Sequence, residues 1–357
     1  MNAPETLHSL LWFQVKALSG YLPEAIELIR EVFADLDLTN RQRIREIVFR
    51  EFTWTEHNVQ SEGYSLAASR VFAHLSRSGM INEHVHGVTS YLKLKELVAD
   101  YEAHEEAFIA RLEALRSQVF QPEHLKIAVT GSQEDIEQIK EGAASLRTSL
   151  SGTRPPIAED AFPELPANQG FTTSADVVYN VQGCNLFTEP AQYSGDFEVL
   201  KTWLSRDYLW NTVRQLGGAY GCFVQLHQLT GTVALVSYRD PQVDKTYDAY
   251  DAIATAVCEL ELSREKLDQL IIGTYGTLDP LQSPAVQGLA ARNEYLCGIT
   301  PEYKQERIAK VIDTEVEAMR AYAPLWEKLT ENRFRVTIGS GEKIREQADL
   351  FDDILEL

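Results

Sequence analysis

The sequence has few of the residues that mark disulfide-rich, metal-thiolate and membrane-spanning proteins. Its 357 residues include four cysteines, and each lies more than 30 residues from the next. That spacing excludes the paired cysteines of zinc and redox motifs and indicates structural thiols in a reducing compartment. No apolar run approaches the ~20 residues of a membrane-spanning helix, and the amino-terminal stretch has no signal-peptide pattern. The sequence therefore predicts no membrane partner and does not distinguish the cytoplasm from an organelle lumen.

Basic residues are also in the minority. The chain has 33 lysines and arginines against 53 aspartates and glutamates, which gives a formal charge of −20. A field of that sign repels phosphate backbones, so nucleic acid is excluded as a partner, and it attracts basic peptides. The other interpretation is that the acidic charge only keeps the protein soluble. The apolar share of 44% and the length are those of a globular protein with two domains.

Zinc-peptidase motifs are absent although the chain has eight histidines. The motif H-E-x-x-H starts at His104 but has Phe108 at the position of its second histidine. The inverted motif H-x-x-E-H fails at all three Glu-His pairs, which have Thr53, Met80 and Phe120 at the first position. Ligands must share one helical face to converge on a metal, so this spacing is required. We therefore expect no metal site in this chain, and neither a nucleophile elbow nor a P-loop is present.

The first 150 residues alternate between strand and helix patterns. Alternating or β-branched residues predict strands over residues 12–18 and 125–129, with helices filling most of the stretch between them. Gly131 and Ser132 then lead into another helix. The following residues, 151–168, are rich in proline and small residues, and they predict a linker.

The residues after the linker repeat the same kind of pattern, strand then helices then strand. Strands are expected over residues 177–181, 222–227, 233–238 and 334–338, and helices over 196–213 and 243–329.

A short motif closes both parts of the chain. Residues 131–136 and 339–344 both read G-S-x-E-x-I, lie 208 positions apart, and stand between a predicted strand and a predicted helix. The sequence therefore predicts an α+β fold with two homologous domains, residues 1–150 and 169–357, each a mostly antiparallel sheet packed against helices. A chance match of a turn and a helix start is the alternative.

One stretch of the second part brings a cation and a phenol together. A predicted helix ends at Gly217 and Gly218, with Arg214 in its last turn, and Tyr220 begins the following hairpin. The guanidinium and the phenol are then expected to face one cavity, where they are able to bind a peptide chain. In the alternative interpretation, Arg214 only caps the helix and Tyr220 is a packed aromatic.

The block VRQLGGAYG, with the SYRDP hairpin end and the KTYDAYD stretch after it, resembles the carboxyl-terminal half of pitrilysin-type (inverzincin) zinc metallopeptidases. The resemblance is to the presequence-protease branch, related to insulin-degrading enzyme, and residues 271–280 share it. It implies four related domains in two halves, with the zinc motif in the first domain and this chain holding the third and fourth.

The same resemblance assigns roles to single residues. Arg214, Gly217, Gly218 and Tyr220 are expected to bind substrate, and Tyr220 to stabilise the transition state in trans. The chain would then be the substrate-binding half of a zinc endopeptidase that degrades unstructured peptides such as cleaved targeting presequences. Its partners would be the peptide and the zinc-bearing amino-terminal half, and it would be inactive alone.

The departures from the family pattern leave other interpretations open. A complete enzyme of this type is nearly three times as long and contains the zinc motif. This chain is therefore a fragment, one subunit of a split enzyme, or a pseudo-peptidase half. A non-catalytic scaffold of the same fold is a second hypothesis, and an independent hydrolase with an unfamiliar site is a third.

Overall fold

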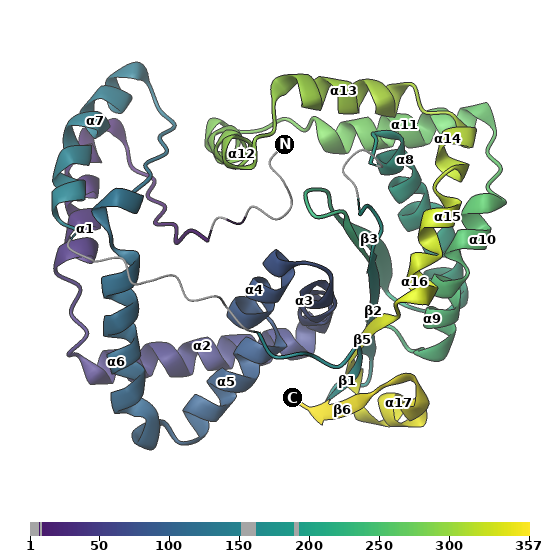
Figure 1. The fold of residues 1–357 in the computed structure, drawn as a ribbon, viewed down its shortest axis with the longest axis horizontal. Coiled ribbons are helices and arrows are strands. Elements are labelled where there is room, and N and C mark those ends of the chain that lie inside the picture. Colours follow the sequence, from purple (N-terminus) through teal and green to yellow (C-terminus); the bar gives the residue numbers. More distant parts are fainter. Residues whose placement is uncertain (1–6, 8, 151–161, 189–192) are drawn as a thin grey trace.

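The computed structural model describes residue 7 and residues 9–150, 162–188 and 193–357. In the amino-terminal part every regular element is helical, and these helices form an arc that leads away from a sheet (Figure 1). Their bounds are α1 Leu22–Ala34, α2 Arg41–Ser61, α3 Gly63–Leu75, α4 Arg77–His86, α5 Val88–Ala99, α6 Tyr101–Val119 and α7 Gln133–Thr148.

All six strands lie in the carboxyl-terminal part of the described chain and form one mixed sheet, in the order β3-β4-β2-β5-β1-β6. β1 pairs in parallel with β5 and β6, and the other neighbours are antiparallel. The strands are β1 Asn168–Thr173, β2 Val178–Asn185, β3 Gly221–His227, β4 Thr232–Tyr238, β5 Phe334–Ser340 and β6 Asp353–Glu356.

Helices that follow the first two strands cover one face of this sheet. Buried side chains from these helices and from the sheet form the largest apolar cluster of the molecule, with Phe197, Tyr250 and Trp326 among them. The helices of this cluster are α8 Asp196–Trp203, α9 Asp244–Asp251, α10 Ile253–Cys258, α11 Arg264–Leu278, α13 Pro301–Ile312, α14 Val316–Arg320, α15 Ala323–Trp326, α16 Lys328–Glu331 and α17 Gly341–Glu346. Helix α12 Pro284–Cys297 buries no residue and lies away from the sheet (Figure 1).

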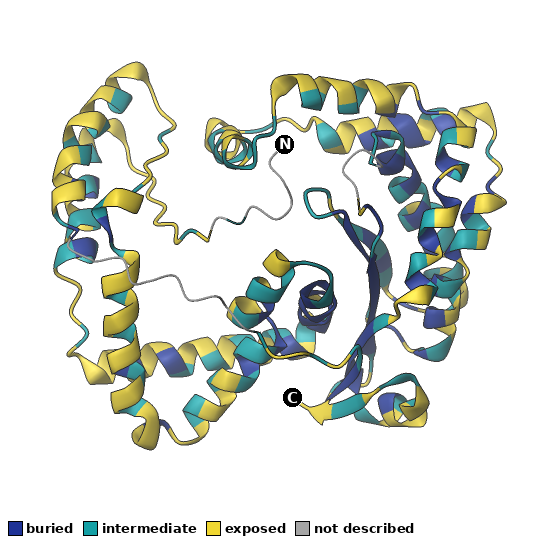
Figure 2. Cartoon of the chain, in the orientation of Figure 1, coloured by how far each residue is buried: buried dark blue, intermediate teal, exposed yellow. Residues whose placement is uncertain are grey.

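The other face of the sheet is covered by α3 from the amino-terminal part. Leu66, Val71 and Phe72 of α3 belong to one buried cluster with sheet residues such as Val181 and Ile338. The central strands are therefore buried on both faces, and Figure 2 shows α3 as the most deeply buried of the amino-terminal helices. Burial of this kind is the main favourable contribution to folding, so the two parts of the chain share a core.

Close approach of α3 to the sheet depends on glycine. A Cβ atom on Gly183 of β2 would lie 2.7 Å from the Val71 side chain of α3. A Cβ atom on Gly63, the first residue of α3, would lie 2.7 Å from the Tyr179 ring. Both distances are shorter than carbon atoms tolerate, so a side chain at either position would push α3 away from the sheet.

Most predicted elements are confirmed, and so is the α+β class. Residues 222–227 and 233–238 form the β3–β4 hairpin, and Gly339-Ser340 leads from β5 into α17. Helix α2 begins directly after Asn40, whose side chain accepts a hydrogen bond from the Arg43 N–H. The sequence interpretation missed β1 and β6, which pair in parallel at one side of the sheet.

The strands predicted over residues 12–18 and 125–129 are wrong for this structure. Neither segment forms a helix or a strand. The same holds for the longer stretches 9–18 and 125–131, which include them. A strand exists only when its backbone pairs with another strand, and the described amino-terminal part offers none. Of the predicted linker 151–168, residues 151–161 lie outside the described residues, and residue 168 already begins β1.

A buried ion pair fixes α3 to its neighbours. Arg70 of α3 lies 3.0 Å from the Glu83 carboxylate of α4, and both side chains are almost completely buried. Arg70 also donates hydrogen bonds to Gln169 of β1 and Thr89 of α5. Burial lowers the pKa of Arg70, and the neighbouring Glu83 opposes that effect. One guanidinium therefore connects three helices to the sheet.

Substitution of Arg70 by methionine is expected to destabilise the protein by about 3–5 kcal/mol, because it leaves a buried carboxylate without its counter-ion. Chemical denaturation of the variant measures this loss. The double variant Arg70→Met, Glu83→Gln removes the uncompensated charge and should recover more than about 1 kcal/mol. If the double variant is no more stable than Arg70→Met, the buried charge is not the cause.

Candidate functional site

Arg214 lies on a helix that is wound more widely than an α-helix. α8 continues as two π-helical segments, Leu204–Tyr208 and Trp210–Leu216. Such segments are rare and often occur at functional sites. Within the second segment the Arg214 guanidinium lies over the Trp210 ring, with its Cζ 3.8 Å from the ring centroid. Cation–π stacking at this distance fixes the direction of the arginine side chain.

The two glycines after this segment turn the chain from helix to hairpin. The Gly217 N–H donates to the Thr212 carbonyl, and the Gly218 N–H donates to the Arg214 carbonyl. Gly218 has φ of 88°, a conformation that favours glycine, and a Cβ atom on Gly217 would lie 2.5 Å from the Val213 carbonyl oxygen. Gly217 and Gly218 therefore shape the turn that sets the distance between Arg214 and Tyr220.

Tyr220 stands at the start of the hairpin and faces solvent. Its N–H donates to the carbonyls of Tyr238 and Arg239, and its ring packs edge-on against Tyr238 at 5.8 Å. The side chain is 66% exposed. The Arg214 Cζ lies 5.9 Å from the Tyr220 ring centroid. The structure thus brings the two predicted residues together, and such exposure is unlike that of a packed aromatic.

Both side chains line an open hollow of about 390 Å³, here called the Arg214–Tyr220 hollow. Its lining residues are Glu62, Tyr64, Arg214, Tyr220, Gly221, Phe223 and Tyr238. Glu62 and Tyr64 were missed by sequence reasoning. They come from the junction of α2 and α3, about 150 positions before Arg214, and no local pattern connects two segments so far apart.

Aromatic rings form the wall of this hollow. The Tyr64 ring packs edge-to-face against Phe223 at 5.8 Å and against Tyr238 at 5.4 Å. Burial raises the pKa of Tyr64, and the carboxylate of Glu62 and the neighbouring Tyr238 raise it further. Tyr64 therefore stays a neutral hydrogen-bond donor at physiological pH.

Next to the hollow, Arg239 has an unusual backbone. Its φ is 47°, and it is the one non-glycine residue with a positive φ in the described chain. On its amino-terminal side, Tyr238 pairs with Gly221. On its other side, the buried carboxylate of Asp240 accepts hydrogen bonds from Asn180, Thr246 and the backbone N–H of Gln242. Burial raises the pKa of Asp240. Both neighbours are thus fixed, and strain maintained in this way often marks a functional site.

The site carries positive charge in an acidic protein. In the described part of the chain, neither Arg214 nor Arg239 lies within ion-pair distance of a carboxylate; instead they stack on Trp210 and Tyr238. Cys222, close to Arg214, is buried, and burial raises the pKa of its thiol to about 11. It is therefore a thiol at neutral pH and a poor nucleophile. The arrangement is suited to binding carbonyl oxygens and to donating a phenolic hydrogen bond.

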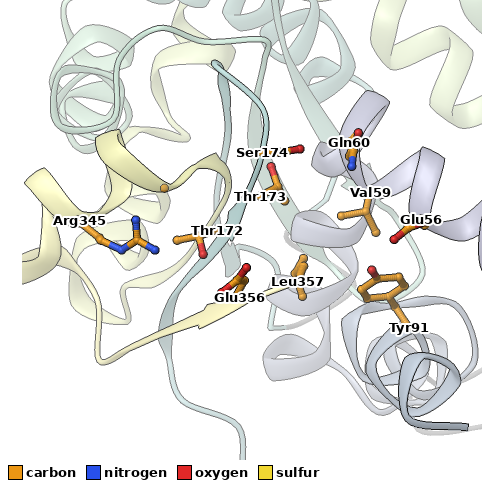
Figure 3. Close-up of a pocket in the computed structure, with 11 residues that line it drawn as sticks. Glu56, Val59, Gln60, Tyr91, Thr172, Thr173, Ser174, Arg345, Glu356 and Leu357 are labelled. Atoms are coloured by element: carbon orange, nitrogen blue, oxygen red, sulfur yellow. The ribbon is translucent and has the colours of Figure 1, made fainter. Parts of the chain in front are cut away.

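A second hollow, of about 260 Å³, lies between α2, α5 and the β1–β6 side of the sheet (Figure 3). Arg345 and Glu56 lie on opposite sides of it, with Thr172, Thr173 and Leu357 between them. No pair of these side chains forms a nucleophile and base.

Among all the residues that the structure describes, no three histidine, cysteine, aspartate or glutamate side chains gather as metal ligands. None of the helices in the described ranges is long and apolar enough to span a bilayer.

Two family sequence models match the chain. Residues 168–340 match the family described as PreP C-terminal domain, and residues 2–97 match a domain described as associated with subfamily C of the M16 peptidases. Protein HypA of Clostridium perfringens is 30% identical over 339 residues, which are 95% of this chain and 34% of that protein. Presequence protease 1, chloroplastic/mitochondrial, of Arabidopsis thaliana is 25% identical over 331 residues, 92% of this chain and 31% of that protein. The chain spans about one third of the length of these relatives.

Solved structures share the fold at low sequence identity. The peptidase M16 inactive domain from Pseudomonas fluorescens matches with a TM-score of 0.57 and 14% identity, over 89% of this chain and 74% of that one. Pitrilysin matches with a TM-score of 0.55 and 7% identity, over 89% of this chain and 33% of that one. The chain therefore shares the fold of these two proteins. Together with the sequence matches, this shared fold shows that the chain belongs to the M16 peptidase family, as a carboxyl-terminal half of the presequence-protease branch.

Replacement of Arg239 by glycine and by alanine separates backbone strain from side-chain contacts. Both variants lose the stack on Tyr238, but only alanine keeps a Cβ atom at positive φ. The glycine variant is expected to be more stable than the alanine variant by about 1–2 kcal/mol. Thermal unfolding followed by circular dichroism measures the difference. Equal melting temperatures would show that the backbone at Arg239 is not strained.

Proposed function

We propose that this chain is the substrate-binding half of a zinc-dependent endopeptidase that degrades unstructured peptides, such as cleaved targeting presequences, and that it is inactive without a zinc-bearing amino-terminal half. The observation that carries the proposal is the pairing of Arg214 with an exposed Tyr220 at an open hollow. The membership of the M16 family and the relatives named presequence protease support it.

The proposal places no zinc site in this chain. The sequence lacks both arrangements of the zinc-peptidase motif, and the described residues hold no cluster of three metal ligands. Under the proposal the metal belongs to the other half of the enzyme, and no step of the chemistry assigned here passes through it.

Tyr220 is proposed to donate its phenolic hydrogen to the carbonyl oxygen of the scissile peptide as negative charge develops there. A single donor of this kind typically contributes a factor of about 10²–10³ in rate. Arg214 is proposed to hold a neighbouring carbonyl of the peptide through its guanidinium. The stack on Trp210 holds that guanidinium in place, so less side-chain entropy is lost when the peptide binds.

The wall of the hollow and the charge of the chain indicate which kind of peptide would bind. Tyr64, Phe223 and Tyr238 present aromatic surface, and Glu62 adds a carboxylate at the same hollow. The net charge of −20 attracts basic peptides over longer range, and spent targeting sequences are basic. These features support an extended, basic and partly aromatic peptide as the ligand.

The division into two related domains, residues 1–150 and 169–357, is part of this proposal. The repeated G-S-x-E-x-I motif supports it, because Ser132 and Ser340 stand directly before α7 and α17. In this arrangement the first domain also supplies Glu62 and Tyr64 to the peptide site of the second.

A reconstituted enzyme tests the proposed roles. The chain is mixed with a zinc-bearing amino-terminal half of a presequence protease, and cleavage of a fluorogenic peptide is followed. Tyr220→Phe is expected to lower kcat by about 10²-fold or more, because it removes one transition-state hydrogen bond. Arg214→Ala is expected to raise KM and lower kcat/KM by about tenfold, since one charge-assisted hydrogen bond is lost.

Matched controls use the same substitutions away from the hollow. Tyr295 of α12 is 86% exposed and Arg111 of α6 is also exposed, so Tyr295→Phe and Arg111→Ala should leave cleavage unchanged. If Tyr220→Phe and Arg214→Ala behave like these controls, the assigned roles are wrong. If no unfolded peptide binds at all, a scaffold of the same fold becomes the better interpretation.

A further inference from the structure

The second hollow of the molecule has the size of a site for a small ligand. It lies between α2, α5 and the β1–β6 side of the sheet and is here called the Arg345–Glu56 hollow (Figure 3). Its volume of about 260 Å³ is close to the lower limit, about 300 Å³, of the pockets that bind small molecules. It shares no lining residue with the Arg214–Tyr220 hollow. A ligand bound there is therefore held by other side chains than those assigned to the peptide.

A buried hydroxyl points into this hollow. Tyr91 of α5 is only 2% exposed, and its ring stacks on Phe52 at 6.1 Å. Figure 3 shows its hydroxyl directed into the hollow, and among the described residues this hydroxyl has no hydrogen-bond partner. Burial raises the pKa of Tyr91, and the nearby carboxylate of Glu56 raises it further, so the phenol stays protonated. Buried hydroxyls normally have a partner, so this one is available to a ligand.

A guanidinium stands at one side of the hollow. A Cβ atom on Gly341 would lie 2.9 Å from Nη1 of Arg345 and 3.4 Å from the Thr172 side chain. The glycine therefore lets the Arg345 guanidinium lie against the first turn of α17, next to β1. No carboxylate in the described part of the chain is within ion-pair distance of it. On the β1 side, the Thr173 hydroxyl accepts from the Ala175 N–H and keeps its own hydrogen to donate. This side of the hollow is suited to a carboxylate.

Two carboxylates face the same hollow. Glu56 of α2 lies across it from Arg345, and Glu356 of β6 lies on the Arg345 side (Figure 3). Neither forms an ion pair with another described residue. The side chains of Val59 and Leu357 lie between the two carboxylates and form an apolar strip. One cation and two anions along an apolar strip complement a small molecule with one carboxylate, two cationic groups and an aliphatic chain.

We propose that the Arg345–Glu56 hollow binds a basic amino acid, free arginine or lysine. The α-carboxylate of the ligand pairs with Arg345, and its α-ammonium pairs with Glu356 on the same side. The aliphatic chain follows the apolar strip, and the side-chain cation reaches Glu56 and the Tyr91 hydroxyl on the other side. A basic amino acid carries these three charges at neutral pH. The inference concerns this hollow alone and does not depend on peptide cleavage.

Calorimetric titration of the full chain with four ligands tests the proposal. L-arginine is expected to bind with a Kd of about 1 mM or lower. Agmatine lacks the carboxylate, Nα-acetylarginine lacks the ammonium, and L-citrulline lacks the side-chain charge. Each should bind at least tenfold more weakly, because it leaves one charge of the hollow unpaired. No binding of L-arginine, or equal binding of all four ligands, would overturn the proposal.

Nα-acetylarginine also represents the last residue of a peptide that ends in arginine. Such a residue has the carboxylate and the side-chain cation, but its nitrogen is part of an amide and carries no charge. If Nα-acetylarginine binds as tightly as L-arginine, Glu356 holds no ammonium. That result would overturn the choice of a free amino acid as the ligand.

Variants assign each charge of the ligand to one side chain. Arg345→Gln should remove the preference for L-arginine over agmatine, and Glu56→Gln should remove the preference over L-citrulline. Arg50→Gln and Glu51→Gln are matched controls, because both residues are exposed on α2 and neither lines the hollow. The controls should keep both preferences. Preferences that persist in Arg345→Gln and Glu56→Gln would contradict the assignment.

Tyr91→Phe tests the buried hydroxyl. Because this hydroxyl has no partner in the described chain, its removal should not lower the melting temperature of the free protein. It should weaken binding of L-arginine by about threefold or more, since one hydrogen bond to the ligand is lost. Binding that is unchanged in Tyr91→Phe would show that the hydroxyl does not face the ligand and would contradict the proposal.

The variants of the other hollow separate the two sites. Arg214→Ala and Tyr220→Phe change no side chain of the Arg345–Glu56 hollow, so both should bind L-arginine as the parent does. Loss of L-arginine binding in these variants would place the ligand in the Arg214–Tyr220 hollow and would overturn the choice of site. Because the readout is binding, a chain that binds L-arginine but supports no peptide cleavage counts only against the proposed peptidase role.

Discussion

The structure depends on the burial of one six-stranded sheet on both faces, with α3 of the amino-terminal part supplying one of the covers. Because that face has no other large cover in the described chain, the two parts of the molecule cannot separate without exposing Val181, Val336 and Ile338 to water. Arg70 adds a polar connection at the same interface, with partners on α4, α5 and β1. The close fit requires glycine at positions 63 and 183.

The peptide site follows from this packing. Because α3 lies on the sheet, its start brings Glu62 and Tyr64 close to Gly221 and Tyr238, at the open end of the β3–β4 hairpin. Arg214 and Tyr220 meet at the same place. The Tyr179 hydroxyl, on β2, donates to the carbonyls of Gln60 and Ser61 and holds this junction in place. The hollow is therefore built by two regions that are distant in sequence, the α2–α3 junction and the residues from Arg214 to Tyr238. Its aromatic wall is part of the interface between the two parts of the chain.

Much of the carboxyl-terminal part was predictable from the sequence, because its helices and most of its strands follow local hydrophobic patterns. The meeting of Arg214 with Tyr220 was predictable too, since both are fixed by one helix end and one glycine turn. Glu62 and Tyr64 were not, because only tertiary packing brings them there. For the segments near Trp12 and Ile127, the sequence predicts strands that the structure does not contain. Their sequence favours strands, but strand formation needs a hydrogen-bonding partner that the described amino-terminal part does not hold.

The central claim is that the Arg214–Tyr220 hollow binds an unstructured peptide. Isothermal titration calorimetry of the chain with a basic, presequence-like peptide tests it most directly, without any partner half. The account predicts measurable binding that Arg214→Ala weakens by about tenfold, equal to about 1.4 kcal/mol, and that Arg111→Ala leaves unchanged. Binding that is unaffected by Arg214→Ala, or no binding at all, would contradict it.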